Sequence, residues 1–140
     1  MKRLLYTAIV AITAFTMGCA GGKGFRSVGV DQFAETAKEP ETQLVDVRTA
    51  EEHTTGHIPG SINIDVKSDN FIDEASRTLD KKRPVAVYCR SGRRSKNAAE
   101  QLAGKGFKVI ELDSGYSGWV KAGKDIEEDK THTPGESSGV

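Results

Sequence analysis

The stretch VAVYCRSGRRS, residues 85–95, decides the fold, and it stands between Pro84 and the helix-forming residues 96–99. Its four consecutive apolar or aromatic residues, 85–88, are typical of a strand buried on both faces in the middle of a sheet. The arginine-rich segment after Cys89 contains Gly92 and is typical of a tight loop. The chain is therefore expected to pass from a central strand through a short loop directly into the N-terminus of a helix.

Segments with strand and helix periodicity alternate on both sides of this stretch. Further strands are expected at residues 28–30, 43–47, 62–64 and 107–112. Helices are expected at 71–79, 95–103 and 115–122, and through 33–37, where Asp31 would cap the helix. Gly104 stands where a left-handed C-cap glycine is common. This alternation predicts one α/β domain, with a parallel sheet covered by helices on both faces and ligands at the carboxyl ends of the strands.

Length and charge limit the organisation of the chain. An N-terminal export segment leaves about 115 of the 140 residues, which is enough for one domain with one core. We expect an export signal at 1–19, a flexible linker at 20–26, one domain at 27–124 and a disordered tail at 125–140, which has almost no apolar residue. Twenty basic residues balance twenty acidic ones, so no overall field favours binding of nucleic acid.

The N-terminus has the pattern of an export signal. Two basic residues precede an apolar run, residues 4–17, that is too short for an ordinary transmembrane helix. The run ends before Cys19 and resembles a bacterial lipoprotein signal, although Thr16 replaces the usual aliphatic residue. The resemblance implies lipidation of Cys19 and a periplasmic or cell-surface location, anchored to a bacterial membrane. A soluble secreted form and an uncleaved anchor are the alternatives.

Cys89 is the candidate nucleophile. If Cys19 is consumed by processing, no second cysteine remains to form an internal disulfide with Cys89. Backbone N–H groups of the loop can converge near the sulfur, and the following helix and the loop arginines add positive potential. These features favour a thiolate and would equally stabilise a persulfide. The alternative is a small, buried, inert cysteine, which three arginines in the next five residues argue against.

Several motifs together resemble the single-domain rhodanese family, the thiosulfate sulfurtransferase-like proteins. They lie within residues 30–123 and are LVDVR at 44–48, Glu52, GHIPGSINI at 56–64, CRSGRRS at 89–95, and Gly115 with Trp119. The resemblance implies a five-stranded parallel sheet and a covalent persulfide on Cys89, and no cofactor is expected. The residues expected to hold the sulfur and its donor are Arg90, Ser91, Gly92, Arg93, Arg94 and Ser95.

Loop length separates this family from the related cysteine phosphatases, which need the pattern C-x5-R to surround a tetrahedral phosphate. Here Arg94 is the fifth residue after Cys89, so the pattern is C-x4-R, and no histidine precedes the cysteine. The shorter loop suits a single sulfur atom. Phosphatase activity is therefore not expected.

Polar residues outside the loop are expected to support the site. Asp46 and Arg48 end a strand at the same sheet edge as Cys89, where an internal ion pair with Glu52 or a loop arginine is expected. His57 is expected to hydrogen-bond the backbone of its turn. Two side chains are expected to pack in the core: His53, where the family commonly has Phe or Tyr, and Trp119. No spacing of His, Cys, Asp and Glu resembles a metal site.

These features together predict a sulfurtransferase. Cys89 would attack the outer sulfur of thiosulfate or of a persulfide, release sulfite or a thiol, and pass the sulfur to cyanide or a thiol. The main alternative is a persulfide carrier that exchanges sulfur with a thiol protein partner and turns thiosulfate over slowly. A non-catalytic scaffold is the third possibility, which the intact Cys89 loop argues against.

Overall fold

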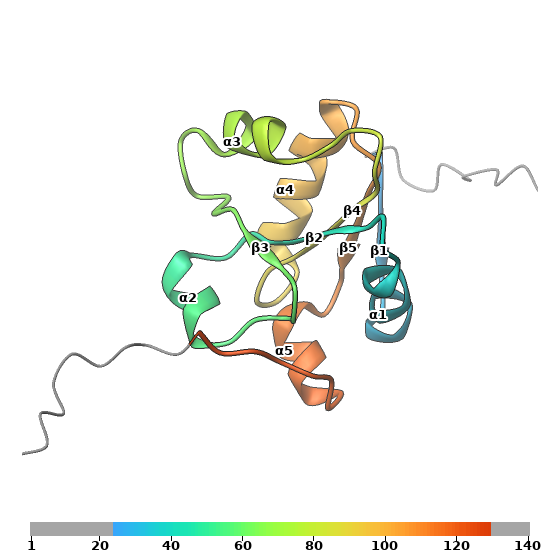
Figure 1. Ribbon diagram of the computed structural model, residues 1–140, viewed down its shortest axis with the longest axis vertical. Helices are drawn as coiled ribbons and strands as arrows, with labels where there is room; N and C mark the ends of the chain where they lie inside the picture. Colours follow the sequence, from blue (N-terminus) through green and yellow to red (C-terminus); the bar gives the residue numbers. More distant parts are fainter. Residues whose placement is uncertain (1–23, 130–140) are drawn as a thin grey trace, which may run out of the picture.

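The computed structural model describes residues 24–129 as a parallel sheet between two layers of helices. The sheet has five strands in the order β1-β5-β4-β2-β3, and all neighbouring strands are parallel (Figure 1). The strands are β1 (Phe25–Val28), β2 (Gln43–Asp46), β3 (Ile62–Asn63), β4 (Val85–Tyr88) and β5 (Val109–Leu112). The helices are α1 (Val30–Lys38), α2 (Ala50–Thr55), α3 (Phe71–Thr78), α4 (Arg93–Gly104) and α5 (Gly115–Lys121). The predicted fold class is confirmed.

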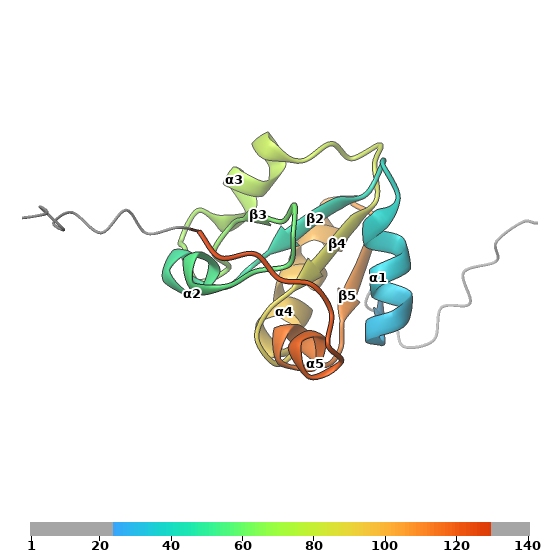
Figure 2. The ribbon, with the colours of Figure 1, turned by 60° about the horizontal axis from the view of Figure 1, so that its bottom comes forward.

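The two faces of the sheet carry different helices, as Figure 2 shows. Helices α3 and α4 pack on one face through an apolar cluster that includes Phe71 and Leu102. Helices α1 and α5 pack on the other face through Phe33 and Trp119. Successive residues of β4 alternate between these two clusters, and all four are buried. This is why the central strand is apolar throughout instead of alternating with polar residues.

Two predictions at the start of the domain are wrong. A strand was expected at 28–30 after a linker at 20–26, but β1 begins inside that linker because it pairs along its whole length with β5. Asp31 does not cap α1. The N-cap is Gly29, and Asp31 lies in the first turn, where its carboxylate interacts favourably with the helix dipole.

Helix α2 was not predicted. It has six residues and none is buried, so it has no apolar stripe to reveal it. Its only signal is a capping box in which Thr49 and Glu52 bond reciprocally to backbone amides. Helix α4 also differs from expectation, since it begins at Arg93 and still includes Gly104. The left-handed glycine that follows α4 is Gly106, with φ +92°.

Residues 125–129, here called the C-terminal segment, belong to the domain, although a disordered tail was expected from residue 125. His57 and Glu127 exchange two backbone hydrogen bonds of 2.8 Å, and the amide of Asp129 donates to the carbonyl of Thr54 at 3.0 Å. Figure 1 shows this segment returning from α5 to α2. Because these contacts use backbone groups, the low hydrophobicity of the segment does not reveal them.

The remaining predictions for the two ends of the chain concern residues outside the described range, 24–129. The export signal with Cys19, the linker residues 20–23 and the tail residues 130–140 lie outside the described residues. Within residues 24–129, no helix is long and apolar enough to cross a bilayer.

Candidate active site

Cys89 directly follows β4 at the carboxyl edge of the sheet, and only 1% of its surface is exposed. The amide of Gly92 donates to its Sγ at 3.1 Å, and the thiol donates to the hydroxyl of Ser95 at 3.4 Å. Helix α4 is twelve residues long and begins at Arg93, so the sulfur lies near the positive end of its dipole. These groups would stabilise a negative charge on the sulfur, whether in a thiolate or in a persulfide.

Contacts with α5 and with Asp113, which precedes α5, fix the conformation of the loop. Backbone amides of the first turn of α5 donate to the carbonyls of Cys89 at 2.7 Å and of Arg90 at 3.0 Å. Gly92 has a φ of +94°, and a Cβ atom there would lie 2.1 Å from the carbonyl oxygen of Asp113. Both the backbone angle and the available space therefore require glycine at this position.

A buried polar chain lies behind the sulfur. The hydroxyl of Ser95 donates to Glu111 at 2.7 Å, and Glu111 is fully buried on β5. Glu111 also accepts from Ser27 and pairs with Lys96 Nζ at 3.0 Å. Burial opposes the charge of Lys96, but hydrogen bonds to Asp113 and Glu111 raise the pKa of Lys96 above its usual value. The sequence predicted Ser95 at the site but missed Glu111, whose only signal is one carboxylate inside an apolar strand.

We expect Ser95→Ala to lower the free energy of unfolding by about 1–3 kcal/mol, since Glu111 would lose a donor while staying buried. The thiol would also lose its hydroxyl contact, so alkylation of Cys89 by iodoacetamide should change in rate. Urea unfolding and timed alkylation measure the two effects. Ser76→Ala, at an exposed position of α3, is the matched control. Equal stability and equal alkylation in the two variants would contradict a role for this hydroxyl.

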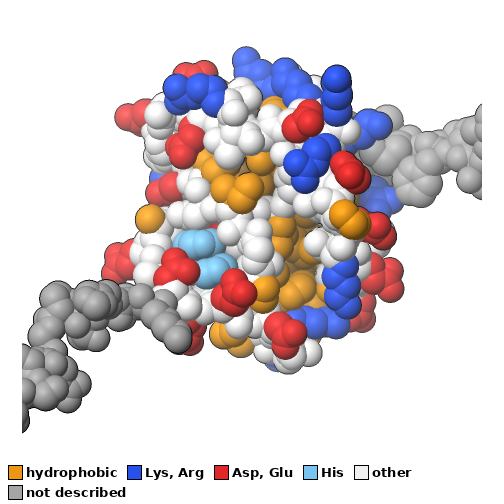
Figure 3. Space-filling view, in the orientation of Figure 1, with side chains coloured by type: hydrophobic (Ala, Val, Ile, Leu, Met, Phe, Trp, Pro, Cys, Tyr) orange, Lys and Arg blue, Asp and Glu red, His pale blue; other side chains and the backbone are white. Residues whose placement is uncertain are grey.

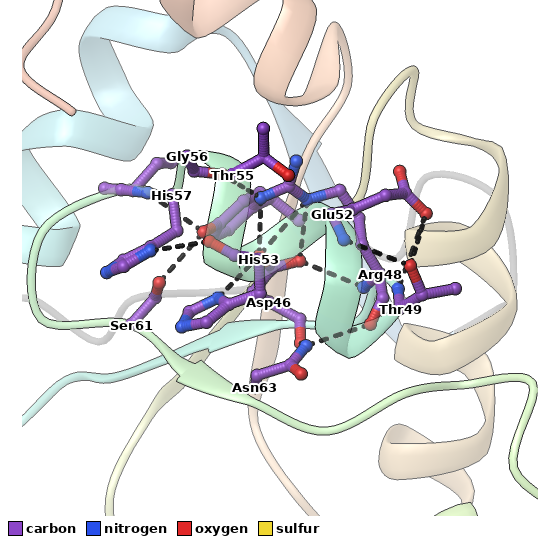
Figure 4. Close-up of polar contacts among 12 residues, drawn as sticks. Asp46, Arg48, Thr49, Glu52, His53, Thr55, Gly56, His57, Ser61 and Asn63 are labelled. Carbon is purple, nitrogen blue, oxygen red and sulfur yellow. Dashed lines mark hydrogen bonds and ion pairs between the residues drawn. The ribbon is translucent and has the colours of Figure 1, made fainter. Parts of the chain in front are cut away.

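Asp46 and Arg48 form a buried ion pair at the end of β2, shown in Figure 4. Nη2 of Arg48 lies 2.7 Å from Oδ2 of Asp46 and donates to the carbonyl of Gly56 at 2.6 Å. Burial opposes the charge of Arg48, but the contact with Asp46 raises the pKa of Arg48 above its usual value. Asp46 and Arg48 were each expected to pair with Glu52 or a loop arginine. In the structure they pair with each other instead.

Glu52 binds Arg94 instead. The two nitrogens Nη1 and Nη2 of Arg94 donate to the two carboxylate oxygens of Glu52 at 2.7 and 2.9 Å, which is a bidentate pair. The hydrogen bonds from Arg94 lower the pKa of Glu52 to about 2. The same bonds, with a smaller contribution from the nearby Cys89, raise the pKa of Arg94. The pair joins α2 to the first turn of α4, so the guanidinium of Arg94 is held in place beside the loop.

The other two loop arginines, Arg90 and Arg93, occupy different places on the surface. Arg90, Ser91 and Arg93 are exposed. Arg90 lines a surface cleft of about 400 Å³, together with Arg48, Glu52, Thr55, Gly56, Tyr116, Ser117 and Val120. The exposed Arg90 can bind a small anion through charge-assisted hydrogen bonds, whereas the guanidinium of Arg48 is already paired with Asp46. The structure therefore places Arg90 and Arg48 together at a candidate anion cleft next to the Cys89 loop, whereas Arg93 does not line it.

The remaining predicted residues have clear positions. Nδ1 of His57 donates to the carbonyl of His53 at 2.8 Å, which confirms its predicted hydrogen bond to the backbone. His53 does more than pack, because its ring stacks on that of His57 with centroids 3.9 Å apart. Trp119 is buried in the core as predicted, and its Nε1 donates to the carbonyl of Asp125 at 2.8 Å.

The fold brings together one grouping of possible metal ligands that spacing along the chain did not indicate. A ring nitrogen of His53, a ring nitrogen of His57 and a carboxylate oxygen of Asp129 all lie within 4.8 Å of one another. Spacing along the chain did not reveal this group, because Asp129 is distant in sequence and reaches α2 only through the C-terminal segment.

A cysteine after the central strand of a parallel sheet, with its sulfur at the N-terminus of the next helix, defines the class of protein: an α/β domain with a cysteine loop at the carboxyl edge of its sheet. Cys89 and its loop lie within residues 29–122, the part of the chain that matches a known protein family. The chain belongs to the rhodanese-like domain family, whose sequence profile matches residues 29–122.

Individual relatives agree with this assignment. The chain is 35% identical over 100 residues to the thiosulfate sulfurtransferase GlpE of Shewanella oneidensis, which covers 70% of this chain and 95% of that protein. A rhodanese-related protein from Thermoplasma volcanium superposes with a TM-score of 0.64 at 28% identity, covering 73% of this chain and 97% of the other. The rhodanese-like domain of the Anabaena protein Alr3790 gives a TM-score of 0.66 at 25% identity, covering 81% and 88%.

Proposed function

We propose that the protein is a sulfurtransferase that carries sulfur as a persulfide on Cys89. The observation that carries the proposal is the environment of Sγ, which accepts the Gly92 amide at 3.1 Å at the N-terminus of α4. Membership of the rhodanese-like domain family and the similarity to a protein named thiosulfate sulfurtransferase support the same role.

The proposed reaction has two displacements. In the first, the thiolate of Cys89 attacks the outer sulfur of thiosulfate, the sulfur–sulfur bond breaks, and sulfite leaves with the electron pair. In the second, cyanide or a thiolate attacks the terminal sulfur of the persulfide, and the Cys89 thiolate leaves. The sulfur atom forms one bond and loses one in each step, so no oxidant or reductant is needed.

The residues of the site suit both steps. The thiolate carries its negative charge on Sγ and the persulfide carries it on the sulfur bound to Sγ, and the Gly92 amide and the α4 dipole favour negative charge in this region. The donor is a dianion, and the exposed Arg90 in the adjacent cleft would bind it through charge-assisted hydrogen bonds. One loop and one cleft thus serve donor binding and sulfur storage.

A mass-spectrometric experiment tests the proposal. The purified protein is incubated with thiosulfate, digested and mapped for one added sulfur, and cyanide is then added to remove it. We expect the added sulfur on Cys89 alone, and its loss to thiocyanate. The variant Cys19→Ser should give the same result, because Cys19 has no part in the reaction. An unmodified Cys89, or an adduct that cyanide leaves in place, would contradict the proposal.

A persulfide carrier is the second candidate. Val120 lines the cleft beside Arg90 and is 46% exposed, which is an apolar contact available to a protein partner. A carrier would take its sulfur from a protein persulfide far faster than from thiosulfate. Comparing the rates of Cys89 loading from thiosulfate and from a persulfidated cysteine desulfurase separates the two functions, since saturable turnover with thiosulfate supports the enzyme.

We also propose that the protein is exported and anchored through lipid on Cys19. The support is the basic start, the apolar run 4–17 and the small residues around Cys19. Cells expressing the native chain should incorporate labelled palmitate into the protein, and Cys19→Ala should abolish incorporation. Cys89→Ala is the matched control and should keep the label. Equal labelling of Cys19→Ala and the native chain would overturn this proposal.

A further inference from the structure

We propose that His53, His57 and Asp129 bind a divalent transition-metal ion of the zinc class, at a site separate from Cys89. One donor atom from each residue lies within 4.8 Å of the other two. The two histidines are four residues apart, on either side of the end of α2, and their rings stack with centroids 3.9 Å apart. Figure 3 shows the histidine side chains together on the surface, bordered by acidic side chains.

The hydrogen bonds of the two rings prepare them for this role. Nδ1 of His53 lies 2.9 Å from the buried carboxylate of Asp46, and Nδ1 of His57 lies 2.8 Å from the carbonyl of His53 (Figure 4). A carboxylate and a carbonyl oxygen accept hydrogen bonds, so the contact is made by Nδ1–H in each ring. A ring in this tautomer carries its lone pair on Nε2. This is the arrangement in which a carboxylate or carbonyl orients a metal-binding histidine.

Carboxylates on the C-terminal segment complete the donor set. Oε2 of Glu127 lies 3.5 Å from Nε2 of His57, and Asp129 supplies the third donor of the group. Two imidazoles and a carboxylate are a common ligand set for zinc, and they leave a position for water or a further carboxylate. Bond lengths of about 2.0–2.1 Å place two donors of a tetrahedral ion roughly 3.3 Å apart, so donors as far apart as 4.8 Å would approach by about 1.5 Å, and the stacked histidine rings would turn so that both reach the ion.

The site lies at the surface of the domain, and a bound ion there would have a structural consequence. A hollow of about 420 Å³ is lined by Glu51, Thr54, Thr55, Glu128 and Asp129, and it shares Asp129 with the site. A bound ion would join the exposed C-terminal segment to α2. That helix also carries Glu52, which holds Arg94 next to Cys89. The ion would thus stabilise the rim of the candidate active site without contacting the sulfur.

Titration of the full chain with Zn²⁺ and Co²⁺ tests the site, in a background with Cys19→Ser and Cys89→Ser so that neither thiol can bind the ion. We expect one Zn²⁺ per chain, a Co²⁺ absorption spectrum of nitrogen and oxygen ligation, and a rise in melting temperature with Zn²⁺. Since loss of an outer partner typically weakens metal affinity about 10–100-fold, His53→Phe and Asp129→Asn should each weaken it by at least about that much.

Three controls keep the test decisive. His132→Ala shows whether the third histidine of the chain binds the ion, and Asp73→Asn, an exposed acid on α3, matches Asp129→Asn. Both controls should bind Zn²⁺ as the background protein does. Circular dichroism without metal establishes that His53→Phe is folded, and the exposed Asp129→Asn reports independently of it. Zn²⁺ affinity that is unchanged in both test variants, or that His132→Ala abolishes, would overturn the proposal.

Discussion

Cys89→Ser is expected to lower the rate of sulfur transfer from thiosulfate to cyanide by at least about 1,000-fold, because a serine hydroxyl cannot form the persulfide. The substitution exchanges one atom in a fully buried position, and the hydroxyl can still accept the Gly92 amide. The loss of activity should therefore occur without loss of the fold. Thiocyanate formation measures the rate, and urea unfolding measures the stability of the variant.

The matched control for this substitution is Cys19→Ser, which changes the same chemical group elsewhere in the chain. It should keep the native rate in the soluble assay. A Cys89→Ser variant that retains substantial turnover would show that sulfur moves directly between donor and acceptor, with no covalent intermediate on the protein.

Gly92→Ala is expected to lower the free energy of unfolding by about 3–5 kcal/mol, which is the range of the most damaging single substitutions. The added methyl would lie 2.1 Å from the carbonyl oxygen of Asp113, and the φ of +94° is unfavourable for alanine. The atom in the way belongs to the backbone, so it cannot move aside by changing rotamer. Sulfur transfer should also fall, because the amide that bonds Sγ belongs to this residue.

Gly104→Ala is the control for Gly92→Ala. It is helical, and an added Cβ would have nothing within 4 Å, so the substitution should raise stability by about 0.4–1 kcal/mol. Urea unfolding of the two variants beside the native protein measures both effects. A Gly92→Ala variant as stable as the native protein would show that the loop has room to rearrange, and that the Gly92 conformation is not required for folding.

Local patterns predicted most of the elements, and their failures have specific causes. The apolar run at β4 and the glycine loop after it were found because burial on both faces and a positive φ each demand particular residues at neighbouring positions. Helix α2 was missed because it buries no side chain. The C-terminal segment was missed because its bonds to His57 and Thr54 are between backbone groups, which leave no mark on composition.

The sequence by itself determined the α/β class, the position of Cys89 at the end of the central strand, and the tight loop that follows it. These follow from the side-chain period of strands and helices and from local steric limits, which act over a few residues. Only the tertiary structure decided which charges pair. It joined Glu52 to Arg94 and Ser95 to Glu111, and it brought His53 and His57 close to Asp129. Such pairs depend on which strand ends and helices become neighbours, and a charge along the chain does not specify its distant partner.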